Sequence, residues 1–384
     1  MTSQYLYLFS DMKSENLKFS NSSLSDLIIQ GKLIIGSSAE ASKLIDRIDR
    51  IQLHAHSYAF YLNLQYGNFD IFDLCSFASE NNLQGVNIHI DAGGEKSIAN
   101  YSPKQLLRLR KYLESHNLNV NIEASSTSNK VINKSVSLAK SLGSKNIRVY
   151  DRYKGQLSDI IQKCTKRMTE VAAIAEKHDL YFVVEPHEVL KSDELVHIIK
   201  TVKSNRVNLL FDFGNMLSTA EQPLQALATM SPYIKQVHLK GANVLEVEKK
   251  GFAQIGTRQG DDNLPHQLMI FKLLMLGENK PQVGAFSLEQ QVGYYASPYR
   301  FENESSDPVI PKRKPSQTGL SPGLTLNKNL KEELKDAYHQ VGFVNETLQK
   351  LNKLASKQVL KKTSVNTGFQ RVPVNVYSET SIIL

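Results

Sequence analysis

At residues 181–185 the chain reads Tyr181-Phe182-Val183-Val184-Glu185, an apolar run of strand length that ends in a carboxylate. Three later runs repeat the pattern and end in Asp212, His238 and Glu289; they span residues 207–212, 234–238 and 283–289. A β-strand of about five residues presents its last side chain at its carboxyl end, and a parallel barrel gathers those ends at one mouth. The pattern predicts that these four polar side chains meet.

Strand-like and helix-like segments alternate from about residue 50, which indicates βα units and a parallel sheet. Strands are predicted at 51–54, 85–90, 118–123, 146–150, 180–185, 207–212, 234–239 and 284–289. Helices are predicted at 70–81, 104–116, 128–142, 157–178, 190–203, 221–230 and 264–276, with an eighth at 326–360. This count predicts an α/β fold, a closed (β/α)8 TIM barrel with an N-terminal extension and a C-terminal helical tail.

The length of 384 residues leaves room for a barrel of about 250 residues and additions at both ends. Residues 1–48 are polar and form the expected N-terminal extension, followed by a catalytic barrel at 49–302. Prolines and glycines at 303–325 indicate a linker, and residues 326–384 are expected to form a C-terminal helix and tail.

Composition excludes several classes of protein. No apolar run approaches the roughly 20 residues that span a bilayer, and the first residues lack a secretory pattern. Cys75 and Cys164 are expected to be reduced, buried thiols, so the expected location is cytoplasmic, without membrane contact. The net charge is +8, but residues 308–384 alone hold 12 basic and 5 acidic side chains. The barrel itself is nearly neutral, which argues against nucleic acid as a partner.

The four strand ends carry the predicted chemistry. Three carboxylates and one imidazole make an oxygen-rich site for a divalent ion such as Mn²⁺, Mg²⁺ or Co²⁺. An ion of this kind stabilises the enediolate that forms when the carbon beside a carbonyl loses a proton. Glu185 and Glu289 come from the fifth and eighth predicted strands, so we assign them to proton transfer as well as to the metal. Asp212 and His238 are assigned to the metal.

Further polar residues near strand ends are candidates for substrate binding. Lys240 lies two residues beyond His238 and is expected on the same side of its strand. The other candidates are His187, Asn215, Glu123, Arg148 and Arg258. Several have structural alternatives: Lys240 as an exposed loop residue, Arg148 paired with a carboxylate, and the segment around Arg258 as a lid. His54, His56 and His89 are expected on the same mouth but are not assigned to the metal.

The segments around these residues resemble a known superfamily. Val184-Glu185-Pro186-His187, Phe211-Asp212-Phe213-Gly214-Asn215, Val237-His238-Leu239-Lys240-Gly241 and Ser287-Leu288-Glu289 are similar to motifs of the xylose-isomerase-like TIM barrels. This superfamily includes sugar phosphate isomerases and epimerases and the family 2 apurinic-site endonucleases. The resemblance covers about residues 50–300. Asn215 stands where many members have His, and Gly241 where Asp commonly follows the Lys.

The resemblance implies that Glu185, Asp212, His238 and Glu289 bind one Mn²⁺ or a related ion, with Mg²⁺, Co²⁺ and Zn²⁺ as alternatives. It also implies that the two Glu exchange a proton with a sugar or sugar-acid substrate. The expected function is thus a metal-dependent carbohydrate isomerase or epimerase. The family resemblance and the amphipathic tail helix are compatible with a homodimer.

Three alternatives stay open from the sequence. The first is a metal-dependent lyase, such as a decarboxylase or dehydratase of a 3-oxo sugar acid or inosose. The second is an endonuclease of the apurinic-site type, although its multi-metal site needs a His where Asn215 stands. The third is a non-enzymatic barrel that binds a partner through its tail. Converging carboxylates argue against this third alternative, because they repel one another without a cation.

Overall fold

The computed structural model describes Leu27, Leu33 and residues 35–247, 251–312, 318–320 and 326–366. Its centre is a closed barrel of parallel strands in the order β1-β11-β8-β7-β6-β4-β3-β2. These strands are β1 (Gln52–His56), β2 (Gly85–His89), β3 (Asn119–Glu123), β4 (Asn146–Val149), β6 (Tyr181–Val184), β7 (Val207–Asp212), β8 (Ile234–Leu239) and β11 (Ala285–Leu288). The predicted (β/α)8 barrel is confirmed, and each strand lies within two residues of its predicted position.

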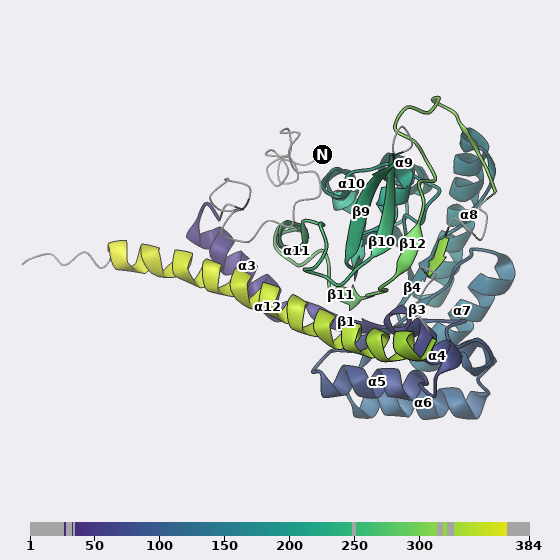
Figure 1. Cartoon of the computed structure of the whole chain (residues 1–384), viewed down its shortest axis with the longest axis horizontal. Coiled ribbons are helices and arrows are strands. Elements are labelled where there is room, and N and C mark those ends of the chain that lie inside the picture. The colour runs from purple at the N-terminus through teal and green to yellow at the C-terminus, as the bar shows by residue number, and fades with distance from the viewer. Residues whose placement is uncertain are drawn as a thin grey trace, which may run out of the picture.

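Helices connect the barrel strands and cover their outer faces (Figure 1). They are α5 (Ile71–Glu80), α6 (Pro103–Ser115), α7 (Asn129–Leu142), α8 (Leu157–His178), α9 (Ser192–Val202), α10 (Pro223–Met230), α11 (His266–Leu274) and α12 (Leu326–Asn366). Side chains determine where two of them begin: Asp70 and Ser102 each form a capping box with the residue three positions later. All eight predicted helices are present.

The core lies between the barrel and these helices. All residues of β2 are buried, as expected for a parallel strand covered on both faces. The helix α7 buries Ile132, Val136 and Ala139, whose spacing of three and four residues places them on one face. Phe182, Phe211 and Phe286 of the barrel strands are completely buried. Burial of apolar side chains therefore holds the strand ends in place.

An irregularity in the pairing of β7 with β8 sets the level of two site residues. The register shifts between Leu209 and Leu210, and beyond the shift Asp212 lies opposite His238. A shift of register changes which residues of the two strands lie opposite one another beyond it. The shift thus places Asp212 opposite His238 at the strand ends.

A second sheet stands at the carboxyl end of the barrel, and we call it the mouth sheet. It consists of β9 (Ala242–Val247), β10 (Gly251–Gly256), β12 (Tyr294–Ala296) and β14 (Thr318–Leu320) in the order β14-β12-β10-β9 (Figure 1). Gly256 lies where β10 meets the chain after β11, and a Cβ there would be 1.8 Å from the carbonyl oxygen of Gln291. The sequence did not predict this sheet.

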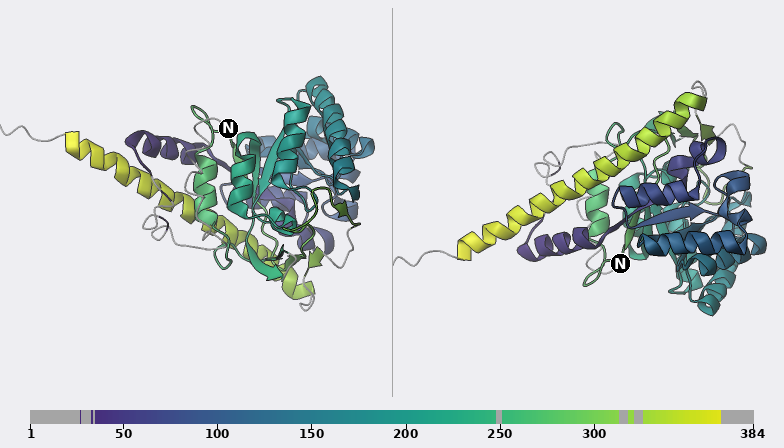
Figure 2. Two further views of the ribbon diagram at one scale, coloured as in Figure 1. Left: turned by 90° about the horizontal axis from the view of Figure 1, so that it is seen from above. Right: turned by 90° about the horizontal axis from the view of Figure 1, so that it is seen from below.

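The helix α12 is the eighth helix of the barrel and continues past it. Figure 2 shows it crossing the barrel and running beside α3 (Ser38–Arg50). Its buried side chains recur every three or four residues and form one apolar stripe: Ala337, Val341, Val344, Leu348, Leu351 and Ala355. This stripe packs the first part of α12 on the barrel and the later part on α3.

The remaining expectations concern the two ends of the chain and the predicted linker at residues 303–325. Within 303–325 the structure contains β14 and β13 (Val309–Ile310), which pairs with β5 (Gly155–Gln156). The domain boundaries stay a prediction, and most of 1–34 and all of 367–384 lie outside the described residues. Cys75 and Cys164 are buried free thiols. Among the described helices, none combines the length and apolar character needed to cross a membrane.

Candidate metal centre

The four residues at the strand ends meet at the carboxyl mouth of the barrel. Glu185 follows β6, Asp212 ends β7, His238 lies in β8 and Glu289 follows β11. Each offers one ligand atom, and these atoms all lie within 4.8 Å of one another. None of the four residues is more than 4% exposed. The structure therefore brings together the group that the sequence singled out.

Each of these residues keeps one buried polar atom without a hydrogen-bond partner. These atoms are Glu185 Oε2, Asp212 Oδ2, His238 Nδ1 and Glu289 Oε2. Buried polar atoms in folded proteins are nearly always satisfied, and here three of the four atoms are met only by ion pairs with Lys240 or Arg148, so the cluster requires an explanation. A divalent cation supplies it, because carboxylate oxygens and a neutral imidazole nitrogen are suitable ligands. The donor set fits one such ion.

The second oxygen of two carboxylates is already held by the protein. Asp212 Oδ1 accepts hydrogen bonds from the backbone N–H of Gly214 and of Asn215, both at 2.7 Å. Asn215 Nδ2 in turn donates to Glu185 Oε1 at 2.8 Å. These bonds fix both carboxylates. Asp212 Oδ2 is left facing Lys240, and Glu185 Oε1 lies 3.4 Å from His238 Nδ1, whereas Glu185 Oε2 lies 3.2 Å from Arg148 Nε. Hydrogen bonds to ligating groups have this orienting role in metal sites.

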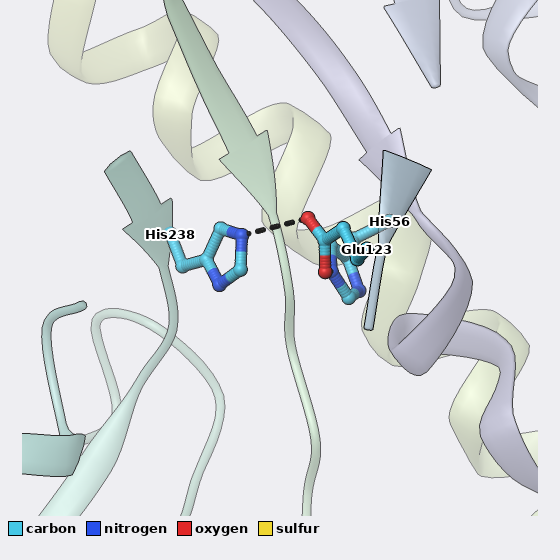
Figure 3. A group of neighbouring side chains, drawn as sticks. All are labelled: His56, Glu123 and His238. Carbon is cyan, nitrogen blue, oxygen red and sulfur yellow. Dashed lines mark hydrogen bonds and ion pairs between the residues drawn. The ribbon is translucent and has the colours of Figure 1, made fainter. Parts of the chain in front are cut away.

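The orientation of His238 is set by Glu123, the last residue of β3. His238 Nε2 lies 3.0 Å from Glu123 Oε1 (Figure 3). Glu123 is fully buried and also accepts from Asn87 Nδ2 at 2.8 Å and from the Arg148 guanidinium. A carboxylate that only accepts requires the proton of His238 to sit on Nε2. Nδ1 then faces the other ligand residues, 3.3 Å from Glu289 Oε2 and 3.4 Å from Glu185 Oε1. Burial acts to lower the pKa of His238, but the carboxylates of Glu123 and Glu289 outweigh it and hold that pKa well above its usual value, so a bound metal ion would take the place of the Nδ1 proton.

His56 belongs to the same hydrogen-bond network but not to the ligand set. Its Nδ1 accepts from the backbone N–H of Tyr58 at 2.9 Å, so Nε2 carries the proton and donates to Glu123 Oε2 at 2.7 Å. Figure 3 shows the rings of His56 and His238 both beside the Glu123 carboxylate. The group His56, Glu123 and His238 also has metal-like spacing, but its members satisfy one another. It therefore acts as support for His238.

The electrostatics of the site are strongly asymmetric. Burial, with the nearby Glu289 and Glu185 charges, raises the pKa of Asp212 to about 7 against the opposing charge of Lys240. Burial also acts to raise the pKa of Glu185, but Arg148 and His238 outweigh it and lower that pKa to about 2. Burial of Glu289 is likewise outweighed by Lys240 and His238, which hold the pKa of Glu289 well below its usual value. Asp212 is thus the carboxylate that is short of positive charge, which a divalent cation would correct.

Lys240 is the cation that the chain itself places at the site. It follows β8, is buried, and its Nζ lies 2.9 Å from Asp212 Oδ2 and 3.3 Å from Glu289 Oε2. Its Nζ also donates to Asn215 Oδ1 at 3.1 Å. Burial acts to lower the pKa of Lys240, but Asp212 and Glu289 outweigh it and raise that pKa. The lysine is therefore held charged beside the ligand group.

A cavity of about 430 Å³ opens beside Glu289 and Lys240. Five tyrosines line it: Tyr58, Tyr61, Tyr66, Tyr150 and Tyr294. Its other lining residues are Leu62, Ser125, Arg152, His187, Asn215, Lys240, Glu289 and Gln291. The volume and the mixture of aromatic and polar groups suit a small polar molecule. Tyr294 belongs to the mouth sheet, which therefore closes one side of the cavity.

The substrate-binding candidates divide into two groups. Lys240, His187 and Asn215 line the cavity, where His187 stacks on Tyr150 with ring centroids 4.0 Å apart. The other three do not line it. Glu123 and Arg148 are buried behind the ligand residues, and Arg258 pairs instead with Asp336 and Glu332 of α12.

Sequence reasoning missed the aromatic walls and misplaced one histidine. Tyr150 directly follows β4 and Arg152 lies two residues later, so their place after a strand was a usable signal, whereas nothing local identifies Tyr294. His54 was expected at the mouth, but it lines a larger cavity of about 760 Å³ together with residues such as Gln52 and Asn119. Those residues begin β1 and β3, so this cavity lies at the amino end, away from the ligand group.

Comparisons with known proteins agree with this architecture. A family model described as xylose isomerase-like TIM barrel matches residues 75–274. The protein YihM of Escherichia coli (strain K12), described as uncharacterized, is 36% identical over 316 residues, which cover 82% of this chain and 97% of YihM.

Two solved structures show the same fold at low sequence identity. The IOLI protein, solved with a bound zinc atom, aligns with a TM-score of 0.54 and 13% identity, covering 78% of this chain and 99% of its own. D-psicose 3-epimerase aligns with a TM-score of 0.51 and 12% identity, with coverage of 78% and 99%. The resemblance noted from the strand-end motifs is confirmed: the chain belongs to the xylose isomerase-like TIM-barrel family.

Proposed function

We propose that the protein is a divalent-metal-dependent isomerase or epimerase of a sugar or sugar acid. The observation that carries the proposal is the buried group of four residues whose ligand atoms lie within 4.8 Å of one another, with Glu289 and Lys240 facing a cavity of about 430 Å³. When bound, the ion would polarise the substrate carbonyl and its neighbouring hydroxyl and so favour an enediolate. Mn²⁺ is the first ion to test, and the zinc in the IOLI structure makes Zn²⁺ the second.

The chain's own residues provide the proton transfer and the orientation. Glu289 lines the cavity, so its carboxylate can remove the proton from the carbon beside the carbonyl. Lys240, 3.3 Å from Glu289, can hold a substrate oxygen. The tyrosines exclude water from the sugar and offer flat apolar faces to its C–H groups. D-psicose 3-epimerase shares the fold, so ketoses are the first substrates to test.

Epimerisation by two carboxylates would also use Glu185. We keep Glu185 as the second proton-transfer residue, since it lies across the ligand group from Glu289. One observation favours a lyase as the second candidate: Glu185 does not line the cavity, because Asn215 and Arg148 occupy its two oxygens. Decarboxylation of a 3-oxo sugar acid needs only one proton donor after the bond breaks, and the pair of Glu289 and Lys240 can supply it.

Two other candidates receive less support. A multi-metal nuclease needs ions a few ångströms apart, and the His56, Glu123 and His238 group offers no orphaned ligand atoms beyond His238 Nδ1. A non-enzymatic barrel would have no use for the orphaned carboxylates. Neither candidate explains the tyrosine-lined cavity beside Glu289.

The test combines metal content with solvent deuterium exchange. The purified protein, supplied with Mn²⁺, is incubated in D₂O with a panel of ketoses and 3-oxo sugar acids. We expect a single ion per chain and deuterium at the carbon beside a carbonyl. Release of CO₂ without exchange into a ketose would select the lyase. A protein that binds no Mn²⁺, Co²⁺ or Zn²⁺ would refute both candidates.

The variant Glu289→Gln is the sharpest single change. We expect it to weaken metal binding at least tenfold and to abolish deuterium exchange, because it removes both a ligand charge and the base. Circular dichroism and Tm would check that the barrel is intact. The matched control is Glu304→Gln, which removes a carboxylate paired with Arg300 in the segment after β12. Full exchange activity in Glu289→Gln would rule out the proposed role.

A further inference from the structure

The helix α12 presents a row of polar side chains to the mouth of the barrel. Glu333 accepts from the backbone N–H groups of Leu62 and Asn63, both at 2.8 Å. Asp336 binds Arg258, and His339 Nε2 lies 2.9 Å from the carbonyl oxygen of Gln259. These residues lie three or four positions apart and so share one face of the helix. That face holds the loop after β1 and the loop after β10.

The most buried member of the row is Gln340, which bridges two barrel strands. Its Nε2 donates to the carbonyl oxygen of Leu239 at 2.8 Å, and its Oε1 accepts from the backbone N–H of Gln290 at 3.0 Å. The carbonyl of Leu239 also accepts from the backbone N–H of Glu289 at 2.9 Å. One amide thus joins the end of β8 to the chain just after β11.

Both bridged positions are next to candidate ligands. Leu239 follows His238, and Gln290 follows Glu289. The Gln340 side chain is completely buried, and its Nε2 makes a further bond of 2.9 Å to Gln259 Oε1. A buried amide with all its hydrogen bonds made has a single orientation, and those bonds fix the positions of the groups that it contacts. The ends of β8 and β11 are also paired directly, so Gln340 adds a second tie, from α12, between the strand ends that carry His238 and Glu289.

We propose that Gln340 is a positioning residue that fixes the geometry of the metal centre by pinning the ends of β8 and β11. The inference rests on the proposed metal site and adds a contribution from a helix that lies beyond residues 75–274, the part that matches the family model. Gln340 touches neither the ligand atoms nor the cavity. It acts through the backbone of Leu239 and Gln290.

The test uses the full chain and measures the affinity and ligand geometry of its metal centre, with no substrate present. Gln340→Met keeps the length of the side chain and removes all three hydrogen bonds, and Gln340→Asn keeps an amide that is one methylene too short. The matched control is Leu351→Ala on the same helix, which removes apolar contact far from the mouth. Mn²⁺ affinity is measured by titration, the visible spectrum of the Co²⁺ form reports ligand geometry, and Tm reports stability.

We expect both Gln340 variants to lose at least tenfold in Mn²⁺ affinity and to change the Co²⁺ spectrum. Leu351→Ala should lower Tm while leaving affinity and spectrum unchanged. If Gln340→Met does not fold, Gln340→Asn carries the test. Wild-type affinity and spectrum in a folded Gln340 variant would overturn the inference and leave the proposed function intact. Equal losses in Leu351→Ala would also overturn it, because the effect would then follow stability alone. A wild-type protein that binds no ion would overturn the proposed function itself.

Discussion

At the scale of single residues, the site depends on how each ligand is held by its neighbours. Asn215 stands where many relatives have a His, yet its amide links Glu185 Oε1 to Lys240 Nζ. Glu123 was predicted to contact substrate, but it lies behind His238 and determines which imidazole nitrogen is free. The sequence shows that Glu123 is a carboxylate at the end of a strand. It does not show which residues the Glu123 side chain contacts, because that depends on which strands are neighbours.

Glu123→Gln tests this role. An amide accepts fewer hydrogen bonds than a carboxylate, so it cannot hold His238, His56 and Arg148 together, and Arg148 is left without its main counter-charge. Replacing the partner of a metal-binding His commonly costs about 10–100-fold in metal affinity. We expect a loss of this size in a Mn²⁺ titration. Glu304→Gln, which removes a carboxylate from Arg300, should bind Mn²⁺ like the wild type.

At the scale of elements, α12 connects to the loop after β1 through Glu333. This loop contains η2 (Ser57–Phe60) and α4 (Tyr61–Tyr66), and its tyrosines line the cavity. Glu333 accepts hydrogen bonds from the backbone at the start of α4, where four N–H groups lack helical partners. The carboxylate of one helix therefore caps another and ties the cavity wall to α12.

This contact predicts a pH dependence of stability. Burial raises the pKa of Glu333 to about 7, although the N–H groups of Leu62 and Asn63 act to lower it. A pKa that is higher in the folded state gives stability that is present below the unfolded value of about 4.3 and is lost as pH rises towards 7. We expect the free energy of unfolding, measured in urea at several pH values, to fall by up to about 3 kcal/mol over that range.

Glu333→Gln cannot ionise, so its stability should vary less between these pH values. The comparison uses the slope of the free energy of unfolding against pH. Its absolute value is not compared, because Gln also loses one acceptor oxygen. Glu346→Gln is the control on the exposed face of α12, where the carboxylate pairs with Lys350. An unchanged slope in Glu333→Gln would show that this carboxyl does not titrate in the range.

At the scale of the whole molecule, four barrel strands and α12 converge on one ligand group. A cation that binds only the folded chain stabilises it by about 2.7 kcal/mol when its free concentration is 100 times Kd. We expect the EDTA-treated protein to unfold at lower temperature than the same protein with Mn²⁺, with a shift that grows with Mn²⁺ concentration. Asp212→Asn should lose most of this shift. A Tm that is independent of Mn²⁺ in the wild type would contradict the proposed site.

The barrel and its ligand group could be read from the sequence because both depend on local patterns. Strand-length apolar runs, amphipathic helices and a polar residue at each strand end are properties of a few consecutive residues, and barrel closure brings those ends together. The mouth sheet, the amino-end location of His54, the place of Glu123 and Arg148 behind the ligands and the Gln340 bridge depend on contacts between distant segments. Only the packed structure decides these, because a side chain's partners are set by strand neighbours and register.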